Sequence, residues 1–186
     1  MMKIKSIISS LFLLSLSSIN LFSFNSSVSA SETVKRVIFQ TRKGYYINCY
    51  DSKGDCQAIP TFNSNPAVSD EIFSLVDLNG GALMNGDKIM LKMRTGYYVN
   101  SYDSAGSIQA QPTYSDDPAV SDEIFTIYKV RGSSGGNQIK AGDKIMIKTR
   151  RNYTFNCYDS QGACKAIPTA NNDYRVSDEV FTIKFL

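Results

Sequence analysis

The same stretch of sequence occurs three times in this chain, at residues 45–52, 97–104 and 153–160. The first copy reads Tyr-Tyr-Ile-Asn-Cys-Tyr-Asp-Ser, and the other two differ from it at only a few positions. A second block, Ser-Asp-Glu followed by Ile or Val and then Phe, follows each copy at the same distance, at 69–73, 121–125 and 177–181. Three copies of a unit of about fifty residues indicate one fold built by triplication.

Each copy predicts four short β-strands. In the second copy the expected strands are 88–92, 97–102, 108–111 and 124–128, which alternate apolar and polar residues between turns rich in Gly, Asp and Pro. Three units are too few for a β-propeller, which needs at least about four blades. We therefore predict an all-β domain with three internal repeats of four strands, arranged as a pseudo-threefold barrel of hairpins. The expected repeats are about 34–85, 86–141 and 142–186.

The same alternation predicts which side chains face the core. Tyr45, Ile47 and Cys49 are expected to point inward, as are their equivalents in the other copies and Phe73, Phe125 and Phe181. The intervening side chains are expected to point outward, namely Tyr46, Asn48, Tyr50, Tyr98, Asn100, Tyr102, Asn156 and Tyr158.

Four cysteines occupy equivalent positions in the first and third copies, at Cys49, Cys56, Cys157 and Cys164. In the second copy Ser101 and Ile108 stand at these two positions, so both cysteines are missing together. A joint loss within one copy is expected only if partners lie in the same copy. We therefore predict the disulfides Cys49–Cys56 and Cys157–Cys164, each across a hairpin turn, with buried free thiols as the alternative.

Residues 1–30 have the pattern of a cleaved signal peptide. Lys3 and Lys5 precede an apolar, Ser-rich run over 7–24, and Val28-Ser29-Ala30 matches a signal peptidase site. Polar residues interrupt the apolar run, which makes a retained membrane anchor the poorer interpretation. We expect a secreted, extracellular protein consisting of a single domain, 31–186, with no membrane span in the mature chain.

Three motifs of the second copy carry a family resemblance. They are Gly-Asp-Lys-Ile-Met-Leu at 86–91, Gly-Tyr-Tyr-Val at 96–99 and Ser-Asp-Glu-Ile-Phe at 121–125. Together they resemble the repeat of the fascin-like, or actin-crosslinking-like, β-trefoils, and the resemblance extends over nearly all of 31–186. It implies a β-trefoil fold but no single function, because trefoils include lectins, inhibitors, cytokines and cytoskeletal proteins. The predicted signal peptide argues against the actin bundling that fascin performs inside cells.

Composition excludes several kinds of chemistry. The chain has no His, which excludes Ser-His-Asp and Cys-His catalysis and any His metal site. Its 20 Lys and Arg nearly balance its 17 Asp and Glu, so there is no electrostatic case for nucleic acid. Asp51, Asp103 and Asp159 begin turns, where Asp bonds its own backbone. We expect no enzyme, no metal site and no cofactor.

The outward-facing Tyr, Asn and Asp side chains are the candidate binding residues. Amide and carboxylate groups suit sugar hydroxyls, and an aromatic ring suits the C–H face of a sugar. Repeated weak sites would gain avidity on a polyvalent glycan. The candidate residues are Tyr46, Asn48, Tyr50, Asp51, Tyr98, Asn100, Tyr102, Asp103, Asn156, Tyr158 and Asp159.

Two functions follow from these features. The first is a secreted, non-catalytic, lectin-like module that binds a glycan. The alternative is a module that binds an extracellular protein, such as a protease inhibitor or a toxin or effector accessory directed at the cytoskeleton. The alternative would use the parts of the repeat that differ, around 131–136 and at Tyr174 and Arg175.

Overall fold

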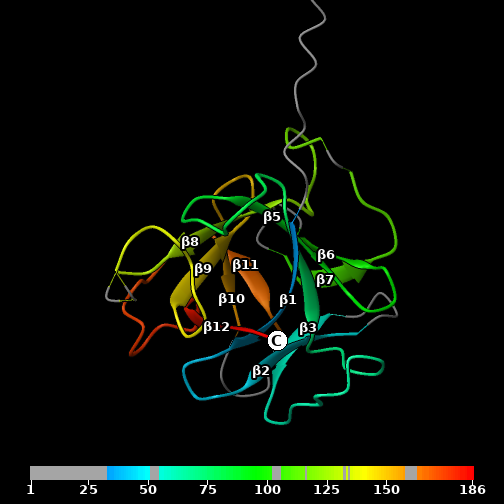
Figure 1. Ribbon diagram of the computed structural model, residues 1–186, viewed down its shortest axis with the longest axis horizontal. Coiled ribbons are helices and arrows are strands. Elements are labelled where there is room, and N and C mark those ends of the chain that lie inside the picture. Colours follow the sequence, from blue (N-terminus) through cyan, green and yellow to red (C-terminus); the bar gives the residue numbers. More distant parts are fainter. Residues whose placement is uncertain are drawn as a thin grey trace, which may run out of the picture.

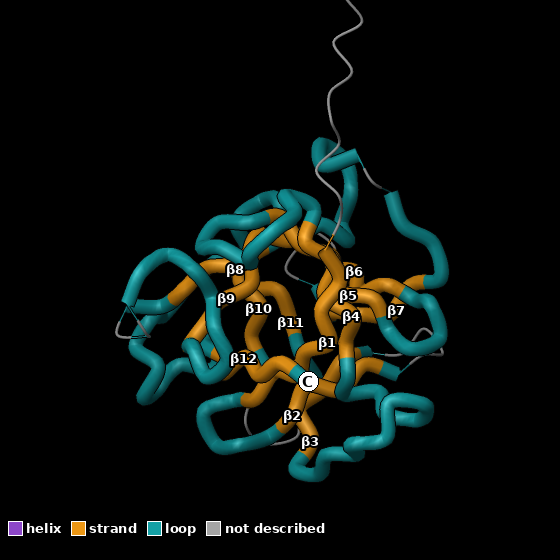
Figure 2. The backbone as a smooth tube through the Cα atoms, in the orientation of Figure 1, coloured by secondary structure: helices purple, strands orange, loops and turns teal. Residues whose placement is uncertain are grey.

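The computed structural model describes residues 33–50, 55–101, 106–115, 117–131, 133, 135–157 and 163–186. Within these ranges the chain forms twelve β-strands and no helix, and therefore no helix that is long and apolar enough to cross a membrane (Figure 2). The predicted signal peptide lies outside the described residues. The strands are β1 Thr33–Gln40, β2 Tyr46–Cys49, β3 Cys56–Ile59, β4 Phe73–Asp77, β5 Lys88–Lys92, β6 Tyr98–Ser101, β7 Ile108–Gln111, β8 Phe125–Lys129, β9 Lys144–Lys148, β10 Thr154–Asn156, β11 Lys165–Ile167 and β12 Phe181–Phe185.

Six strands pair in a continuous antiparallel cycle. Strand β1 pairs with β4, β4 with β5, β5 with β8, β8 with β9, β9 with β12, and β12 returns to β1. Three hairpins, β2–β3, β6–β7 and β10–β11, branch from β1, β5 and β9 (Figure 1). The sheet is therefore not a simple barrel, because the hairpins depart from the cycle through single residue pairs.

Apolar side chains from all three copies form one core. Phe39, Phe73, Phe125 and Phe181 are at most 1% exposed, so the inward positions predicted for the last three are confirmed. Tyr45 and Tyr97 pack at the edge of this core and are only partly buried, because each lies next to the turn that leads into a hairpin. Because the core is shared, each copy buries its apolar side chains mainly against the other two.

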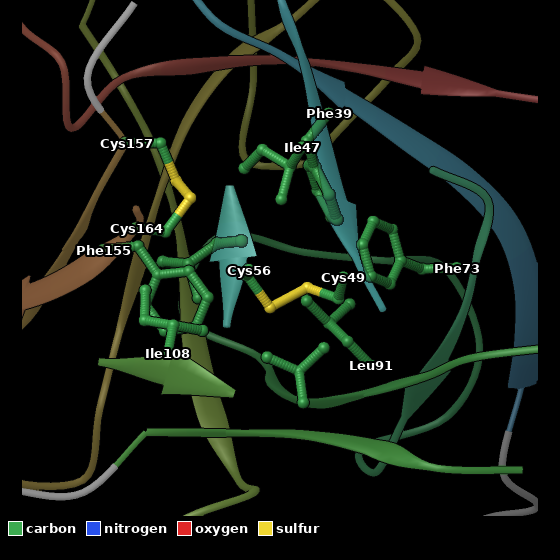
Figure 3. A pocket seen from close by; sticks show the side chains of 12 residues that line it. Phe39, Ile47, Cys49, Cys56, Phe73, Leu91, Ile108, Phe155, Cys157 and Cys164 are labelled. Atoms are coloured by element: carbon green, nitrogen blue, oxygen red, sulfur yellow. A yellow bond between two sulfur atoms is a disulfide. The ribbon is translucent and has the colours of Figure 1, made fainter. Parts of the chain in front are cut away.

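Both predicted disulfides are confirmed. Cys49 pairs with Cys56 and Cys157 with Cys164, and Cys49 and Cys56 are direct partners in the β2–β3 register. Figure 3 shows the two bridges in one apolar region, where Ile108 of the second copy lines the same space of only about 10 Å³. The bridges therefore occupy positions that apolar packing fills in the second copy, and the space left between them is too small for a ligand.

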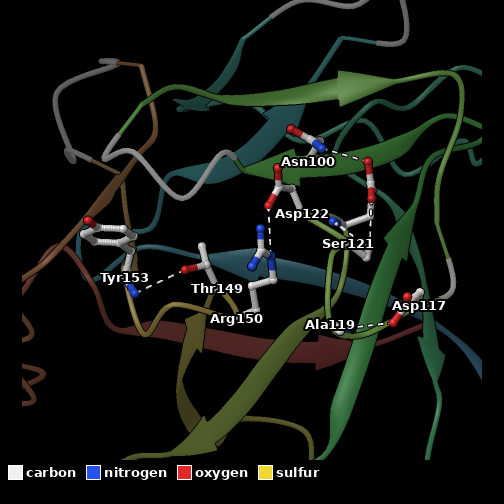
Figure 4. Close-up of polar contacts among 9 residues, drawn as sticks. Asn100, Asp117, Ala119, Ser121, Asp122, Thr149, Arg150 and Tyr153 are labelled. Atoms are coloured by element: carbon white, nitrogen blue, oxygen red, sulfur yellow. Dashed lines mark hydrogen bonds and ion pairs between the residues drawn. The ribbon is translucent and has the colours of Figure 1, made fainter.

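Ion pairs link each copy to its neighbour. Each Arg before a hairpin contacts the Asp of a Ser-Asp-Glu block from another copy, at 3.2–3.3 Å from Nε to Oδ1. Figure 4 shows the contact between Arg150 and Asp122. The three pairs run around the molecule in one direction, and they are Arg94–Asp70, Arg150–Asp122 and Arg42–Asp178.

Candidate functional site

The structure describes only part of the predicted binding set. Asp51, Tyr102, Asp103, Tyr158 and Asp159 lie outside the described residues. The candidates that can be placed are Tyr46, Asn48, Tyr50, Tyr98, Asn100 and Asn156.

The prediction that the three Asn side chains point outward is wrong. Asn48, Asn100 and Asn156 are 5%, 4% and 5% exposed. Asn48 and Asn100 are stabilised in the interior by a buried Glu that accepts a hydrogen bond from the side-chain amide. Asn48 Nδ2 donates to Glu71 Oε1 at 2.8 Å, and Asn100 Nδ2 donates to Glu123 Oε1 at 2.7 Å. Strand alternation alone misassigns these residues, since a polar group is buried readily where a polar partner meets it.

The Glu of each Ser-Asp-Glu block is held by its own Ser as well. Ser121 Oγ donates to Glu123 Oε2 at 2.8 Å, and the Glu123 backbone N–H donates back to Ser121 Oγ at 3.2 Å (Figure 4). The same pair of bonds joins Ser69 with Glu71. These blocks therefore cap a local turn, and in addition they form a buried network with the preceding hairpin.

The predicted Tyr residues lie closer to the surface, and two of them pair with aromatic rings that sequence analysis missed. Tyr46 stacks on Phe62 with ring centroids 5.0 Å apart, and Tyr98 contacts Tyr114 at 4.3 Å. The third copy has Thr154 and Ala170 at the corresponding positions. At the position of Tyr46 and Tyr98 the third copy therefore has a fully buried Thr154 in place of an aromatic ring near the surface. The joint loss of both aromatic residues in one copy is a sequence signal that could have revealed the pair.

Tyr50 is 46% exposed, as predicted, and lies near the end of the first hairpin. Its hydroxyl accepts a hydrogen bond from Gln57 Nε2 at 2.7 Å. The ring is therefore accessible while its polar end is already held by the protein.

A surface pocket of about 370 Å³ in the second copy combines aromatic and polar groups. Tyr114, which is 51% exposed, lies beside Gln111, and the buried Asn100 and Glu123 also line the pocket. Asp122 is a further lining residue, whose Oδ1 already contacts Arg150. The first and third copies have Ile59 and Ile167 in place of Gln111. This combination of an exposed ring, a side-chain amide and a carboxylate is therefore particular to the second copy.

A second depression, of about 440 Å³, borders the same tyrosine pair. Tyr98 lines this depression and Tyr114 lines the pocket, so the two contacting rings separate the two spaces. Lys92 Nζ lies 5.5 Å from the centroid of the Tyr98 ring, and Arg36 and Arg94 are also lining residues. One side of the tyrosine pair is therefore rich in amide and carboxylate groups, and the other is basic.

Comparison with solved structures identifies the fold. The chain is similar to the SDF2-like protein from Arabidopsis thaliana, with a TM-score of 0.60 and 11% identity over 82% of this chain and 94% of that one. It is also similar to Cry35Ab1, with a TM-score of 0.55 and 13% identity over 82% of this chain and 36% of that one. This chain thus matches about a third of Cry35Ab1 and nearly all of the SDF2-like protein.

These similarities show a β-trefoil-like, all-β fold. They do not support membership of the fascin-like family, and at such low identity they carry the fold alone. No protein-family model matches the chain, and no curated protein matches it in sequence.

Proposed function

We propose that this chain is a secreted, non-catalytic β-trefoil of three four-strand repeats that binds carbohydrate, with its main site in the second copy. The fascin-like resemblance of the repeat motifs fits this architecture. The two disulfides fit an oxidising compartment, and they agree with the predicted signal peptide. The proposal does not use the buried Asn residues as equivalent sugar contacts in all three copies.

The observation that carries the proposal is the pocket beside Tyr114. An exposed ring offers a flat surface to the C–H face of a sugar, and the Gln111 amide and Glu123 carboxylate offer a donor and acceptors for hydroxyl groups. Glu123 is 8% exposed and its two oxygens already accept hydrogen bonds from Asn100 and Ser121, so the part of the carboxylate that borders the pocket is held in place before a ligand binds. Such preorganisation reduces the entropic cost of binding.

A glycan array, followed by titration of the best ligand, tests this function with variants that copy the other repeats. Tyr114→Ala installs the residue found at Ala170, and Gln111→Ile installs the residue found at Ile59 and Ile167. Because both changes reproduce natural solutions of the same fold, the variants are expected to fold. Each is expected to weaken binding about tenfold, which corresponds to ~1.4 kcal/mol.

Phe62→Ala, in the first copy, is the matched control and is expected to leave affinity within about twofold. If no soluble glycan or insoluble polysaccharide binds, the carbohydrate proposal fails. If Phe62→Ala and Tyr114→Ala lose equal glycan affinity, binding occurs in both copies and the proposal of a single main site is contradicted.

A further inference from the structure

Five paired residues form a row that crosses the basic depression and ends at the pocket of the second copy. Arg36 of β1 faces Ser74 of β4, Ser74 faces Lys92 of β5, Lys92 faces Tyr98 of β6, and Tyr98 faces Gln111 of β7. Directly paired residues in antiparallel strands present their side chains on the same face of the sheet. The row therefore places two cations, a hydroxyl and an aromatic ring along one surface.

Corresponding rows recur elsewhere in the molecule, and their first two members are hydrogen-bonded. Lys88 Nζ donates to Thr126 Oγ1 at 2.7 Å, and Lys144 Nζ donates to Thr182 Oγ1. These pairs are also direct register partners. In both rows the ammonium group is held down on the strand surface by the hydroxyl next to it.

The row of the basic depression departs from this arrangement. Arg36 and Ser74 replace the Lys–Thr pair, and no hydrogen bond or ion pair joins the exposed Arg36 guanidinium to another described residue. Arg94, also in the depression, is bound to Asp70 at 3.2 Å. Arg36 and Lys92 therefore supply the positive charge that remains for a ligand.

The rest of the lining is apolar. Val34 is 59% exposed and Val76 is its register partner, and both line the depression together with Ile72. An occupant must consequently combine negative charge with an apolar or C–H surface. A free inorganic anion would satisfy only the first of these requirements.

We propose that this depression binds the acidic residue of an anionic saccharide, one that carries a carboxylate or a sulfate. The Arg36 guanidinium offers two parallel N–H donors to two oxygens of the anion, and Lys92 adds a second positive charge. The C–H face of the sugar ring lies against the Tyr98 ring and the side chains of Val34 and Val76. This inference rests on the proposed carbohydrate function for its class of ligand, and it names the charge that the ligand carries.

The tyrosine pair connects this subsite with the pocket of the second copy. Because the Tyr98 and Tyr114 rings are in contact, a polysaccharide can follow them from the neutral pocket to the basic depression. The predicted ligand is therefore an acidic polysaccharide, bound more weakly as salt concentration rises.

The decisive variant is the double substitution Arg36→Lys with Ser74→Thr, which installs the Lys–Thr pair found at Lys88 and Thr126. It retains the net charge and copies a pair that this fold already accommodates. The probes are polygalacturonate, its fully methyl-esterified neutral form and dextran sulfate, titrated at low and high salt. Lys88→Gln is the control for loss of a cation outside the depression.

Wild-type protein is expected to bind polygalacturonate or dextran sulfate at least tenfold more tightly than the esterified polymer. The double variant is expected to lose that preference, whereas Lys88→Gln retains it. Preference for polygalacturonate assigns the acid as a carboxylate, and preference for dextran sulfate assigns it as a sulfate. Failure of both anionic polymers to bind, or an unchanged preference in the double variant, overturns the inference.

The two proposals fail separately in these measurements. If neutral glycans bind and Tyr114→Ala abolishes that binding while the double variant has no effect on any probe, only the acidic subsite is wrong. If the double variant abolishes polygalacturonate binding and Tyr114→Ala changes nothing, the depression binds the acidic saccharide alone and the pocket beside Tyr114 is not a saccharide site.

Discussion

Asp77 is a fully buried carboxylate at the end of β4. Its Oδ1 accepts hydrogen bonds from the backbone N–H groups of Asn79 and Gly80, at 3.0 and 3.2 Å, while Oδ2 has no partner among the described residues. Burial raises the pKa of this carboxyl group above its ordinary value, with a smaller contribution from the nearby negative charge of Asp87. The two backbone bonds act in the opposite direction and are outweighed.

A raised pKa in the folded state means that ionising Asp77 opposes folding. As pH rises from the unfolded-state pKa through the folded-state pKa, the native protein loses stability relative to a variant with a neutral side chain. Asp77→Asn, which retains the Oδ1 acceptor, is therefore expected to have a Tm advantage that grows as pH rises from about 4 toward neutral and alkaline values. Differential scanning calorimetry across this range measures it.

Asp173 supplies a control of opposite sign. A hydrogen bond from the Arg175 backbone N–H lowers the pKa of this exposed carboxyl group, helped by the Arg175 side chain. Its stabilising contribution is present above the unfolded-state pKa and is lost as pH falls through the folded-state pKa. Asp173→Asn should consequently lose stability at neutral pH and not at acid pH. A Tm difference for Asp77→Asn that is constant with pH would contradict the interpretation of Asp77.

At the scale of elements, the Ser-Asp-Glu block that precedes β4 has two separate roles. Glu71 points inward and joins the turn to strand β2 through Asn48. Asp70 points toward the surface and contacts Arg94. The backbone carbonyl of Asp70 also accepts from the Cys49 N–H at 3.1 Å, so the block is bound to the hairpin through its main chain as well.

Glu71→Ala is expected to destabilise the fold by about 2–4 kcal/mol, because it leaves the buried Asn48 amide and Ser69 hydroxyl without their acceptor. Urea unfolding followed by circular dichroism gives the free energy of unfolding. The adjacent change Asp70→Ala removes the partly exposed ion pair with Arg94 and is expected to cost below about 1 kcal/mol. If the two variants lose equal stability, the buried network does not have the importance assigned to it.

At the scale of the whole molecule, three hairpins contribute to one core and only two of them are bridged. Ser101 and Ile108 are direct partners in β6 and β7, at the positions that Cys49 and Cys56 occupy in the first hairpin. Ile108 is 1% exposed, so it fills with hydrocarbon the volume that the bridges fill elsewhere. The fold therefore does not require a disulfide to form this hairpin.

The double variant Cys49→Ser with Cys56→Ile replaces the first disulfide by the Ser and Ile that the second copy has at the same positions. We expect it to fold and to lose about 2 kcal/mol of stability, because the closed loop is short and its entropy gain is modest. A circular dichroism spectrum tests whether the variant folds, and calorimetry measures its loss of stability. The double variant Cys157→Ser with Cys164→Ile makes the same exchange in the third copy and serves as the comparison. A variant that fails to fold would show that the bridge is required for this hairpin.

Several features could be predicted from the sequence because they repeat within it. The triplicated motifs indicate the all-β class, and the joint absence of both cysteines from the second copy indicates their pairing. The core Phe residues follow from strand periodicity. The orientation of Asn48 and Asn100 could not be predicted in this way, because the Glu side chain that binds each of them comes from a loop 23 residues further along the chain.

The sequence by itself therefore determined the β-strands, the disulfides and the apolar core, all of which depend on local spacing or on comparison between copies. Only the tertiary structure decided which polar residues are available to a ligand. It buries Asn48 and Asn100 against Glu. It pairs the Asp of each Ser-Asp-Glu block with an Arg from a neighbouring copy, and it aligns Arg36, Lys92 and Tyr98 from three separate strands. The physical reason is that a side chain's exposure depends on partners distant in sequence, and those partners meet only when the strand cycle closes.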